Sequence, residues 1–293
     1  MAIRPFRPED APRLVELSLG CAQSESDFVL NPYWQSEPEL FAEFERFGID
    51  PEEHLLVADA GDGEVLGVVG YLRRPGDAAA GMFCPIVDRG ERRRGLGGEL
   101  VRAALRRGLE LGIKLATAGI GTRNRAGYSL LAAHGFRPVR QHFLMRCDAA
   151  PRALPPVEKL EFGPAKPDDA DAVLSIYRAC GFQARTPDEM RSALGDGRHA
   201  HAVARRGDEV VAFVEIETHW PQRIWVAYVG VTAPLRDRGV GSNLMAWAVA
   251  GSFQRGAQTA LLMLSPANRT ALRAYEKVGF RRHRLVDVLE KGL

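Results

Sequence analysis

Two stretches of the chain change from a continuous apolar run to a helical repeat of apolar positions across a glycine-rich turn. Residues 224–231 are apolar and rich in β-branched and aromatic side chains, as expected of a strand buried on both faces. After the turn, apolar residues recur at helical spacing, at Leu244, Met245, Ala248, Val249 and Phe253. Five apolar residues lie 144 positions earlier, at Leu100, Val101, Ala104, Leu105 and Leu109. Both regions are therefore predicted to fold as strand, turn and helix.

The two turns share the pattern Arg-x-x-Gly-x-Gly, at Arg236, Gly239 and Gly241 and again at Arg92, Gly95 and Gly97. The first turn of a helix carries unpaired N–H groups and a partial positive charge, so an anion binds there, and glycine lets it approach the backbone. The alternative is a plain glycine turn with solvated arginines, but two copies with matched flanking periodicity favour a phosphate-binding turn. The pattern is neither a Walker loop nor the dinucleotide fingerprint.

The residues that follow the second turn carry a family resemblance. Strand Thr259–Leu264, then Asn268, then Tyr-Glu-Lys-Val-Gly-Phe at 275–280 resembles the GCN5-related N-acetyltransferase (GNAT) family. The first half follows with Asn124 and Gly135-Phe136, again 144 positions earlier. The resemblance implies an α/β (α+β) fold with two tandem GNAT-like domains, similar in layout to the mycothiol synthases. Each domain is expected to hold a mixed, mostly antiparallel sheet flanked by helices and to end in a strand hairpin.

The family resemblance also implies the cofactor, acetyl-CoA. In the second half the expected contacts are Val229, Gly230, Val231, Arg236, Asp237, Arg238, Gly239, Val240, Gly241, Ser242 and Asn268. In the first half they are Arg92, Arg93, Arg94, Gly95, Leu96, Gly97, Gly98 and Asn124. The strand residues are expected beside the pantetheine arm and the turn beside the pyrophosphate.

A proline-rich segment, Ala149–Val157, marks the expected linker. It predicts an N-terminal domain at 1–148, a linker at 149–159 and a C-terminal domain at 160–293. Lys-Pro-Asp-Asp-Ala at 166–170 echoes Arg-Pro-Glu-Asp-Ala at 7–11, at an offset of 159. The first repeat therefore carries extra residues before its turn, and we expect most of them between Gly20 and Asp50.

Acetyl transfer to an amine needs a neutral amine and a proton for the departing thiolate. The family places a tyrosine near the thioester sulfur, which here is Tyr275, although an aromatic on an amphipathic helix can also be a core residue. Asn268 is equally a plain helix N-cap. Glu215, Glu217 and His219 share one face of a predicted strand, where they either line an acceptor cleft or form a solvated face.

The first half has Leu131 where the second has Tyr275, and its strand Val65–Leu72 carries no carboxylate. Catalysis is therefore expected in the C-terminal domain, while the N-terminal domain is catalytically degenerate and either still binds a CoA molecule or supports its partner.

Composition removes several other classes. A net charge of +2 gives no case for nucleic acid, and no apolar run approaches 20 residues, so no membrane span is expected. The N-terminus lacks a signal-peptide core, which predicts a cytoplasmic protein. Cys21, Cys84, Cys147 and Cys180 show no metal-ligand spacing, so no metal is expected.

The sequence thus predicts an acetyl-CoA-dependent N-acetyltransferase acting on a primary amine of a small molecule or an amino terminus, as a monomer or a homodimer. One alternative is a CoA-binding sensor without turnover. Another is an acyltransferase with a different acyl-CoA donor, because the turn would contact only the CoA part of the donor and not its acyl group.

Overall fold

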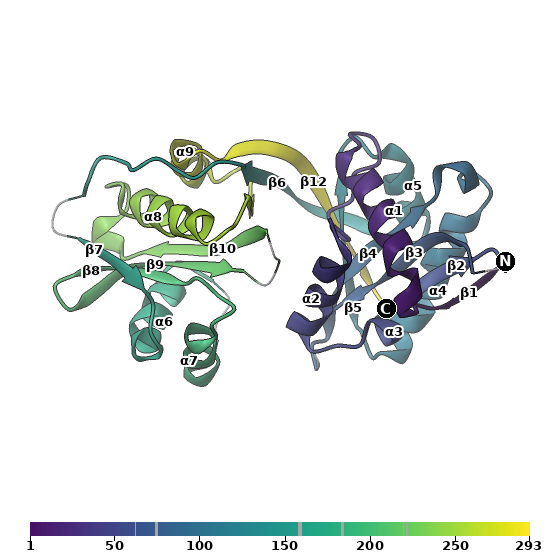
Figure 1. Ribbon diagram of the computed structural model, residues 1–293, viewed down its shortest axis with the longest axis horizontal. Helices are drawn as coiled ribbons and strands as arrows, with labels where there is room; N and C mark the ends of the chain where they lie inside the picture. Colours follow the sequence, from purple (N-terminus) through teal and green to yellow (C-terminus); the bar gives the residue numbers. More distant parts are fainter. Residues whose placement is uncertain (62, 74–75, 158–159, 183–184, 219, 221) are drawn as a thin grey trace. The chain divides into compact units, whose positions relative to one another are not determined.

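The computed structural model describes residues 1–61, 63–73, 76–157, 160–182, 185–218, 220 and 222–293. The chain divides into two compact units (Figure 1). Unit 1 holds Met1–His142 and Arg284–Leu293, and unit 2 holds Phe143–His283. The predicted domains, 1–148 and 160–293, differ from this division, because residues 284–293 belong to unit 1 and residues 143–148 belong to unit 2.

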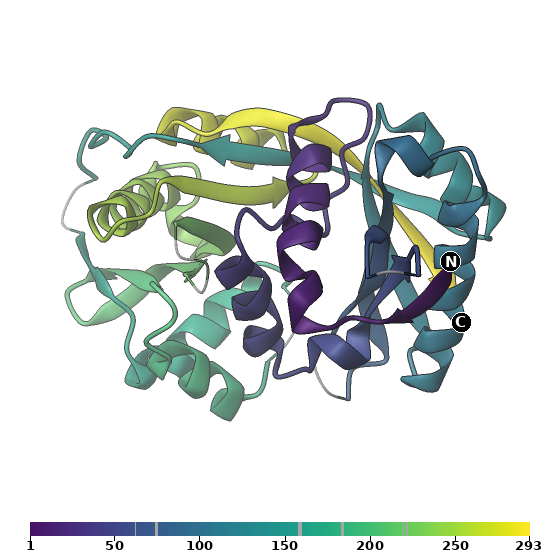
Figure 2. The same cartoon turned by 45° about the vertical axis from the view of Figure 1, so that its right-hand side comes forward.

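Unit 1 is a sheet with helices on its faces (Figures 1 and 2). Its elements in chain order are β1 (Ala2–Pro5), α1 (Ala11–Gln23), α2 (Glu37–Phe47), α3 (Pro51–His54), β2 (Leu55–Asp59), β3 (Val65–Leu72), β4 (Ala79–Val87), α4 (Leu96–Glu110), β5 (Leu115–Gly121), α5 (Arg125–Ala133) and the start of β6 (Arg137–Cys147). The strands run in the order β1-β2-β3-β4-β5-β12. Pairs are antiparallel except β4 with β5, which is parallel.

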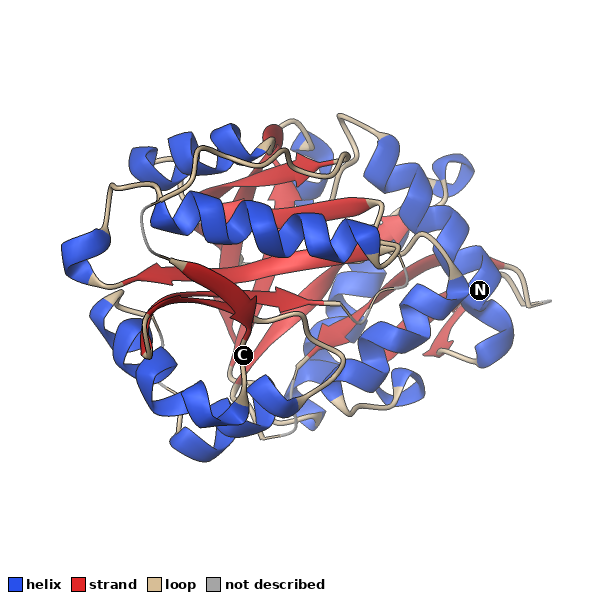
Figure 3. Ribbon diagram, turned by 60° about the vertical axis from the view of Figure 1, so that its left-hand side comes forward, coloured by secondary structure: helices blue, strands red, loops and turns tan. Residues whose placement is uncertain are grey.

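Unit 2 repeats this plan (Figure 3). Its elements are β7 (Glu161–Pro164), α6 (Ala170–Ala179), α7 (Pro187–Gly195), β8 (Ala202–Arg206), β9 (Glu209–Glu217), β10 (Arg223–Val231), α8 (Val240–Gln254), β11 (Thr259–Leu264), α9 (Arg269–Val278) and the start of β12 (Arg281–Gly292). The strand order is β6-β11-β10-β9-β8-β7. Among the described residues of this unit, β10 and β11 again form the one parallel pair. The predicted α/β fold with two tandem domains is confirmed.

The last strand of each repeat is exchanged. Residues 286–292 of β12 pair antiparallel with β5 in unit 1, and residues 143–147 of β6 pair antiparallel with β11 in unit 2. The expected terminal hairpin is therefore wrong for the part of the chain described, because each repeat ends in one long strand. Val286 and Leu289 are fully buried in unit 1, so the C-terminal segment is part of its core.

The core of unit 2 has two layers, one on each face of its sheet. Alternation along β9 sends Val214 and Ile216 to the face covered by α8, and Phe213 to the face covered by α6 and α7 (Figure 1). No helix in the described part of the chain is long and apolar enough to cross a membrane.

Candidate functional site

The two glycine turns have the same backbone. Gly95 and Gly239 are the N-caps of α4 and α8 and adopt left-handed conformations, with φ of 90° and 84°. Two residues before each glycine, Arg93 and Asp237 also have positive φ, at 65° and 60°. Non-glycine residues rarely adopt this region, so its recurrence at equivalent positions marks a conserved geometry within the chain. Each turn leads directly into the exposed amides of a helix N-terminus.

The first arginine of each motif braces the turn. Arg92 Nε donates to the carbonyl of Val87, and Arg236 Nε donates to the carbonyl of Val231, both at 3.0 Å. Arg236 also donates through Nη2 to the carbonyl of Ala179 at 3.0 Å. These guanidinium groups fasten the turn to the end of the preceding strand, so recognition of an anion rests mainly on the backbone amides.

The turn of unit 2 leaves room for a ligand close to the backbone. Val240 and Ser242 are buried and anchor the first turn of α8, whereas Asp237 and Arg238 are exposed. A Cβ on Gly241 would lie 3.1 Å from Val231 Cγ2, so a larger residue would crowd the cradle.

An open strand edge lies beside this turn. β10 and β11 pair for three residues only, Arg223–Trp225 with Thr259–Leu261. Beyond Trp225, the pairing recorded for β10 within the described residues is with β9 alone, through Val231. Val229, Gly230 and Val231 therefore follow a gap between two separating strands. An extended chain with amide groups fits such a gap, because it can pair with the free edge as an extra strand.

Tyr275 and Asn268 belong to helix α9, which follows β11. Tyr275 packs against the α8-side core with its ring centroid 6.2 Å from that of Phe280. Burial raises the pKa of Tyr275 to about 12, so its hydroxyl stays protonated at neutral pH. Asn268 is exposed and caps α9, accepting from the amide of Ala271 at 3.1 Å. This placement is compatible with Tyr275 as a core aromatic or as a catalytic acid, and with Asn268 as a helix cap or as a cofactor contact.

Glu215 and Glu217 lie on the α6 side of β9 and are buried, at 4% and 8% exposure. The solvated-face alternative is therefore wrong for both, because helices α6 and α7 cover this face. Glu215 Oε1 forms an ion pair with Arg185 Nη2 at 2.6 Å. The third candidate, His219, lies outside the described residues.

Aromatic side chains complete this face, and the sequence analysis did not assign them. Tyr228 of β10 packs against Tyr177 and Phe182, with ring centroids 5.0 and 4.8 Å apart. Arg185 lies over the Tyr177 ring, 5.6 Å from its centroid. No local signal predicts that Arg185 meets Glu215, because the two are 30 positions apart and joined only by the tertiary fold.

The first repeat differs from the second at the equivalent positions. Leu131, the counterpart of Tyr275, is fully buried in the core of unit 1. Asn124 caps α5 and is buried, donating to the carbonyl of Phe28 at 3.4 Å. Arg94 forms an ion pair with Glu91 at 2.9 Å. The four cysteines are free thiols, and no metal-binding cluster occurs among the described residues.

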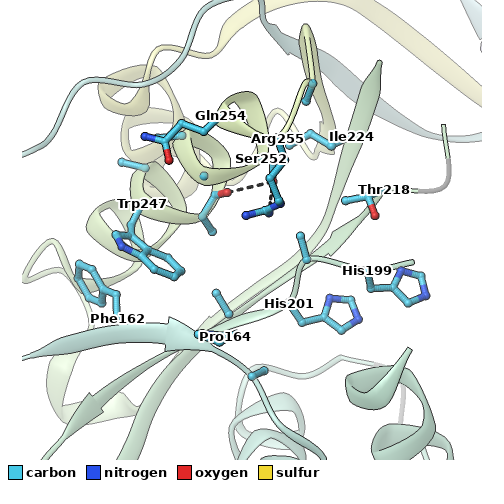
Figure 4. Close-up of a pocket in the computed structure, with 18 of the residues that line it drawn as sticks. Phe162, Pro164, His199, His201, Thr218, Ile224, Trp247, Ser252, Gln254 and Arg255 are labelled. Atoms are coloured by element: carbon cyan, nitrogen blue, oxygen red, sulfur yellow. Dashed lines mark hydrogen bonds between the residues drawn. The ribbon is translucent and has the colours of Figure 1, made fainter. Parts of the chain in front are cut away.

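A separate cavity of about 940 Å³ lies on the opposite, α8-covered side of the unit 2 sheet (Figure 4). Phe162, Trp247, Arg255 and His201 are among its lining residues, and Arg255 Nη2 donates to Ser252 Oγ at 3.2 Å. The residues of the glycine turn, 236–242, do not line it. This cavity is therefore distinct from the turn and the strand gap.

Comparison with known proteins agrees with these features. Residues 21–136 and 170–280 match the Acetyltransferase (GNAT) family. The mycothiol acetyltransferase of Mycobacterium leprae (strain Br4923) is 27% identical over 279 residues, covering 80% of this chain and 82% of that protein. The mycothiol acetyltransferase of Corynebacterium glutamicum (strain ATCC 13032) is 32% identical over 74 residues, a quarter of each chain.

Solved structures share the fold. A GCN5-related N-acetyltransferase from Sphaerobacter thermophilus has a TM-score of 0.80 at 22% identity, covering 99% of this chain and 95% of that one. A tandem GNAT protein from the clavulanic acid biosynthesis pathway has a TM-score of 0.71 at 15% identity, covering 99% and 98%. With both repeats matched and an acetyltransferase relative aligned over most of its length, the chain belongs to the GNAT family and is an N-acetyltransferase.

Proposed function

We propose that unit 2 binds acetyl-CoA and transfers its acetyl group to a primary amine of a small molecule. The observation that carries this proposal is the juxtaposition of a left-handed glycine turn, at Gly239, with the unpaired edge of β10 that ends at Val231. The amides at the start of α8 suit a pyrophosphate, and the strand gap suits an amide-bearing pantetheine arm.

Tyr275 is proposed as the general acid. The helix that carries it follows directly on β11, one of the two strands that border the gap. With a pKa of about 12 the phenol holds its proton at neutral pH, and we propose that it gives this proton to the sulfur as the carbon–sulfur bond breaks. The side-chain amide of Asn268, exposed at the start of the same helix, is proposed as a cofactor contact.

The acceptor is proposed to approach from the face that carries Tyr228, Tyr177 and the Arg185–Glu215 pair. Aromatic faces attract an alkylammonium group, and Tyr228 and Tyr177 supply such faces here. Because Arg185 already pairs with Glu215, we propose that a water molecule takes the proton from the amine and that Glu215 and Glu217 position this water. The M. leprae relative is named for a small molecule, mycothiol, which supports this class of acceptor.

The direct test is release of CoA thiol from acetyl-CoA, measured with a panel of small-molecule amines and amino-terminal peptides. We expect turnover with at least one small amine. Turnover with peptides alone contradicts the small-molecule acceptor, and hydrolysis without any acceptor dependence contradicts amine acetylation.

A further inference from the structure

The gap between the separating strands is filled in unit 1. β4 and β5 pair through Ala79–Met82 and Leu115–Ala118 and then diverge, as β10 and β11 do. Residues 28–31, which follow α1, enter this gap and bond to both edges. The amide of Leu30 donates to the carbonyl of Gly119, the amide of Gly121 to the carbonyl of Phe28, and the amide of Cys84 to the carbonyl of Asn31, each at 3.0 Å. Residues 28–31 therefore act as an extra strand.

The gap in unit 1 is shaped for these residues. A Cβ on Gly119 would lie 2.8 Å from Leu30 Cβ, and a Cβ on Gly121 would lie 3.2 Å from Phe28 Cβ. Phe28 is fully buried. The positions 144 residues later are Met263 and Ser265, which carry side chains. The second repeat thus lacks the glycines that admit a buried peptide strand.

The glycine turn of unit 1 also has its own charge and packing contacts. The Asp27 carboxylate forms ion pairs with Arg92 at 3.1 Å and Arg89 at 3.4 Å. Burial opposes ionisation of Asp27, yet Arg92 holds its pKa below the usual range. At the start of α4, a Cβ on Gly97 would lie 3.0 Å from Leu130 Cδ2, where the second repeat has Ala274. Unit 1 thus holds a carboxylate against the first arginine of its motif and an apolar side chain against Gly97.

The connection between the first two helices supplies these residues. It runs over 24–36 in unit 1 but only over 180–186 in unit 2. This accounts for part of the extra length of the first repeat and gives the added segment a structural role.

We propose that residues 27–31, hereafter the internal strand, permanently occupy in unit 1 the position that acetyl-CoA takes in unit 2. The chain therefore binds one CoA molecule, and the first repeat supports the protein without binding the cofactor. This inference rests on the proposed function, because unit 2 defines the cofactor position.

The test is the stoichiometry of CoA binding to the full chain, by native mass spectrometry and calorimetry. A matched pair of variants assigns the site. Gly241→Asp places a carboxylate at the cradle of unit 2, and Gly97→Asp does the same in unit 1. We expect one CoA per chain in the wild type, a loss of affinity of about tenfold or more in Gly241→Asp, and unchanged affinity in Gly97→Asp. Two bound molecules, or weakened binding in Gly97→Asp, would overturn the inference.

Hydrogen exchange on the wild type keeps the test decisive even if a variant does not fold. The amides of Leu30, Gly121 and Cys84 should be strongly protected, with the same rates in the absence and presence of saturating CoA. Faster exchange of these amides on adding CoA would show that the internal strand is displaced, contrary to the inference. Absence of any CoA binding to the wild type is a different result, and it contradicts the proposed function itself.

Discussion

Leu30 and Gly119 are in direct backbone contact: the amide of Leu30 donates to the Gly119 carbonyl at 3.0 Å, and the Leu30 Cβ occupies the space above the glycine. Such an approach is open only to a residue without a side chain. The internal strand and the glycines of β5 therefore form one packed unit, which distinguishes the first repeat from the second.

Gly119→Ala is expected to destabilise unit 1 by about 1–3 kcal/mol, because the new methyl group overpacks against Leu30. In the Leu30→Gly background the same substitution should cost less, since the clashing Cβ is absent. Gly81→Ala on β4 is the control, because the nearest atom to its Cβ would be 3.6 Å away. Denaturant unfolding measures the free energies, and equal costs of Gly119→Ala in the two backgrounds would refute the contact.

The exchanged strands make the two repeats interdependent. Deleting residues 284–293 removes three buried apolar side chains from unit 1, Val286, Val288 and Leu289, each worth about 1.5–3 kcal/mol. We expect unit 1 to unfold or become protease-sensitive in the truncated chain. Limited proteolysis with mass mapping measures this, and a truncated chain as resistant as the full one would contradict the structural role of β12.

Acid should destabilise unit 2 through His201. Burial lowers the pKa of His201 to about 3, and its Nδ1 accepts from the amide of Ile216 at 3.0 Å. Because the unfolded chain takes up the proton near pH 6.5, this contribution to stability is complete above that pH. It is lost at about 1.4 kcal/mol per pH unit as the pH falls toward 3.

A His201→Gln variant can keep the acceptor without titrating. Its free energy of unfolding should therefore fall less steeply than that of the wild type between pH 7 and pH 4. Parallel pH profiles for the two proteins would show that His201 is not the group responsible.

Removing Arg185 should leave the Glu215 carboxylate buried without this cation, at 4% exposure. Arg185→Met is expected to destabilise unit 2 by about 3–5 kcal/mol, and the double variant Arg185→Met/Glu215→Gln by less. Equilibrium unfolding of the two single variants and the double variant gives the coupling energy. A coupling energy near zero would mean that the Arg185–Glu215 ion pair does not stabilise unit 2.

Much of the fold follows from local patterns. The structure forms strands over Val65–Leu72 and Thr259–Leu264 with the predicted bounds, and helices α4 and α8 follow the two glycine turns as the apolar spacing predicts. Periodicity and capping residues fix these elements within their own segments. The exchange of β6 and β12 did not follow, because an isolated strand pattern carries no information about which sheet it joins.

The candidate site also has a part that local sequence patterns predict and a part that they do not. The glycine turn can be predicted from the spacing of its arginine and glycines, because its geometry depends on residues that are close together in sequence. The Arg185–Glu215 pair and the internal strand depend on contacts across the fold. The sequence does carry one sign of the internal strand. When the repeats are aligned at an offset of 144 positions, Gly119 and Gly121 of the first repeat match Met263 and Ser265 of the second. The two glycines mark the place where another backbone segment packs closely against β5 in the first repeat.

The central claim, acetyl transfer in unit 2 with Tyr275 as the acid, is tested most directly by the steady-state kinetics of Tyr275→Phe. Tyr128→Phe, which removes a phenol from α5 in unit 1, is the control. We predict that Tyr275→Phe lowers kcat by about a hundredfold with little change in the KM for acetyl-CoA, and that Tyr128→Phe leaves both unchanged. Full kcat in Tyr275→Phe, or a matching loss in Tyr128→Phe, would contradict the account.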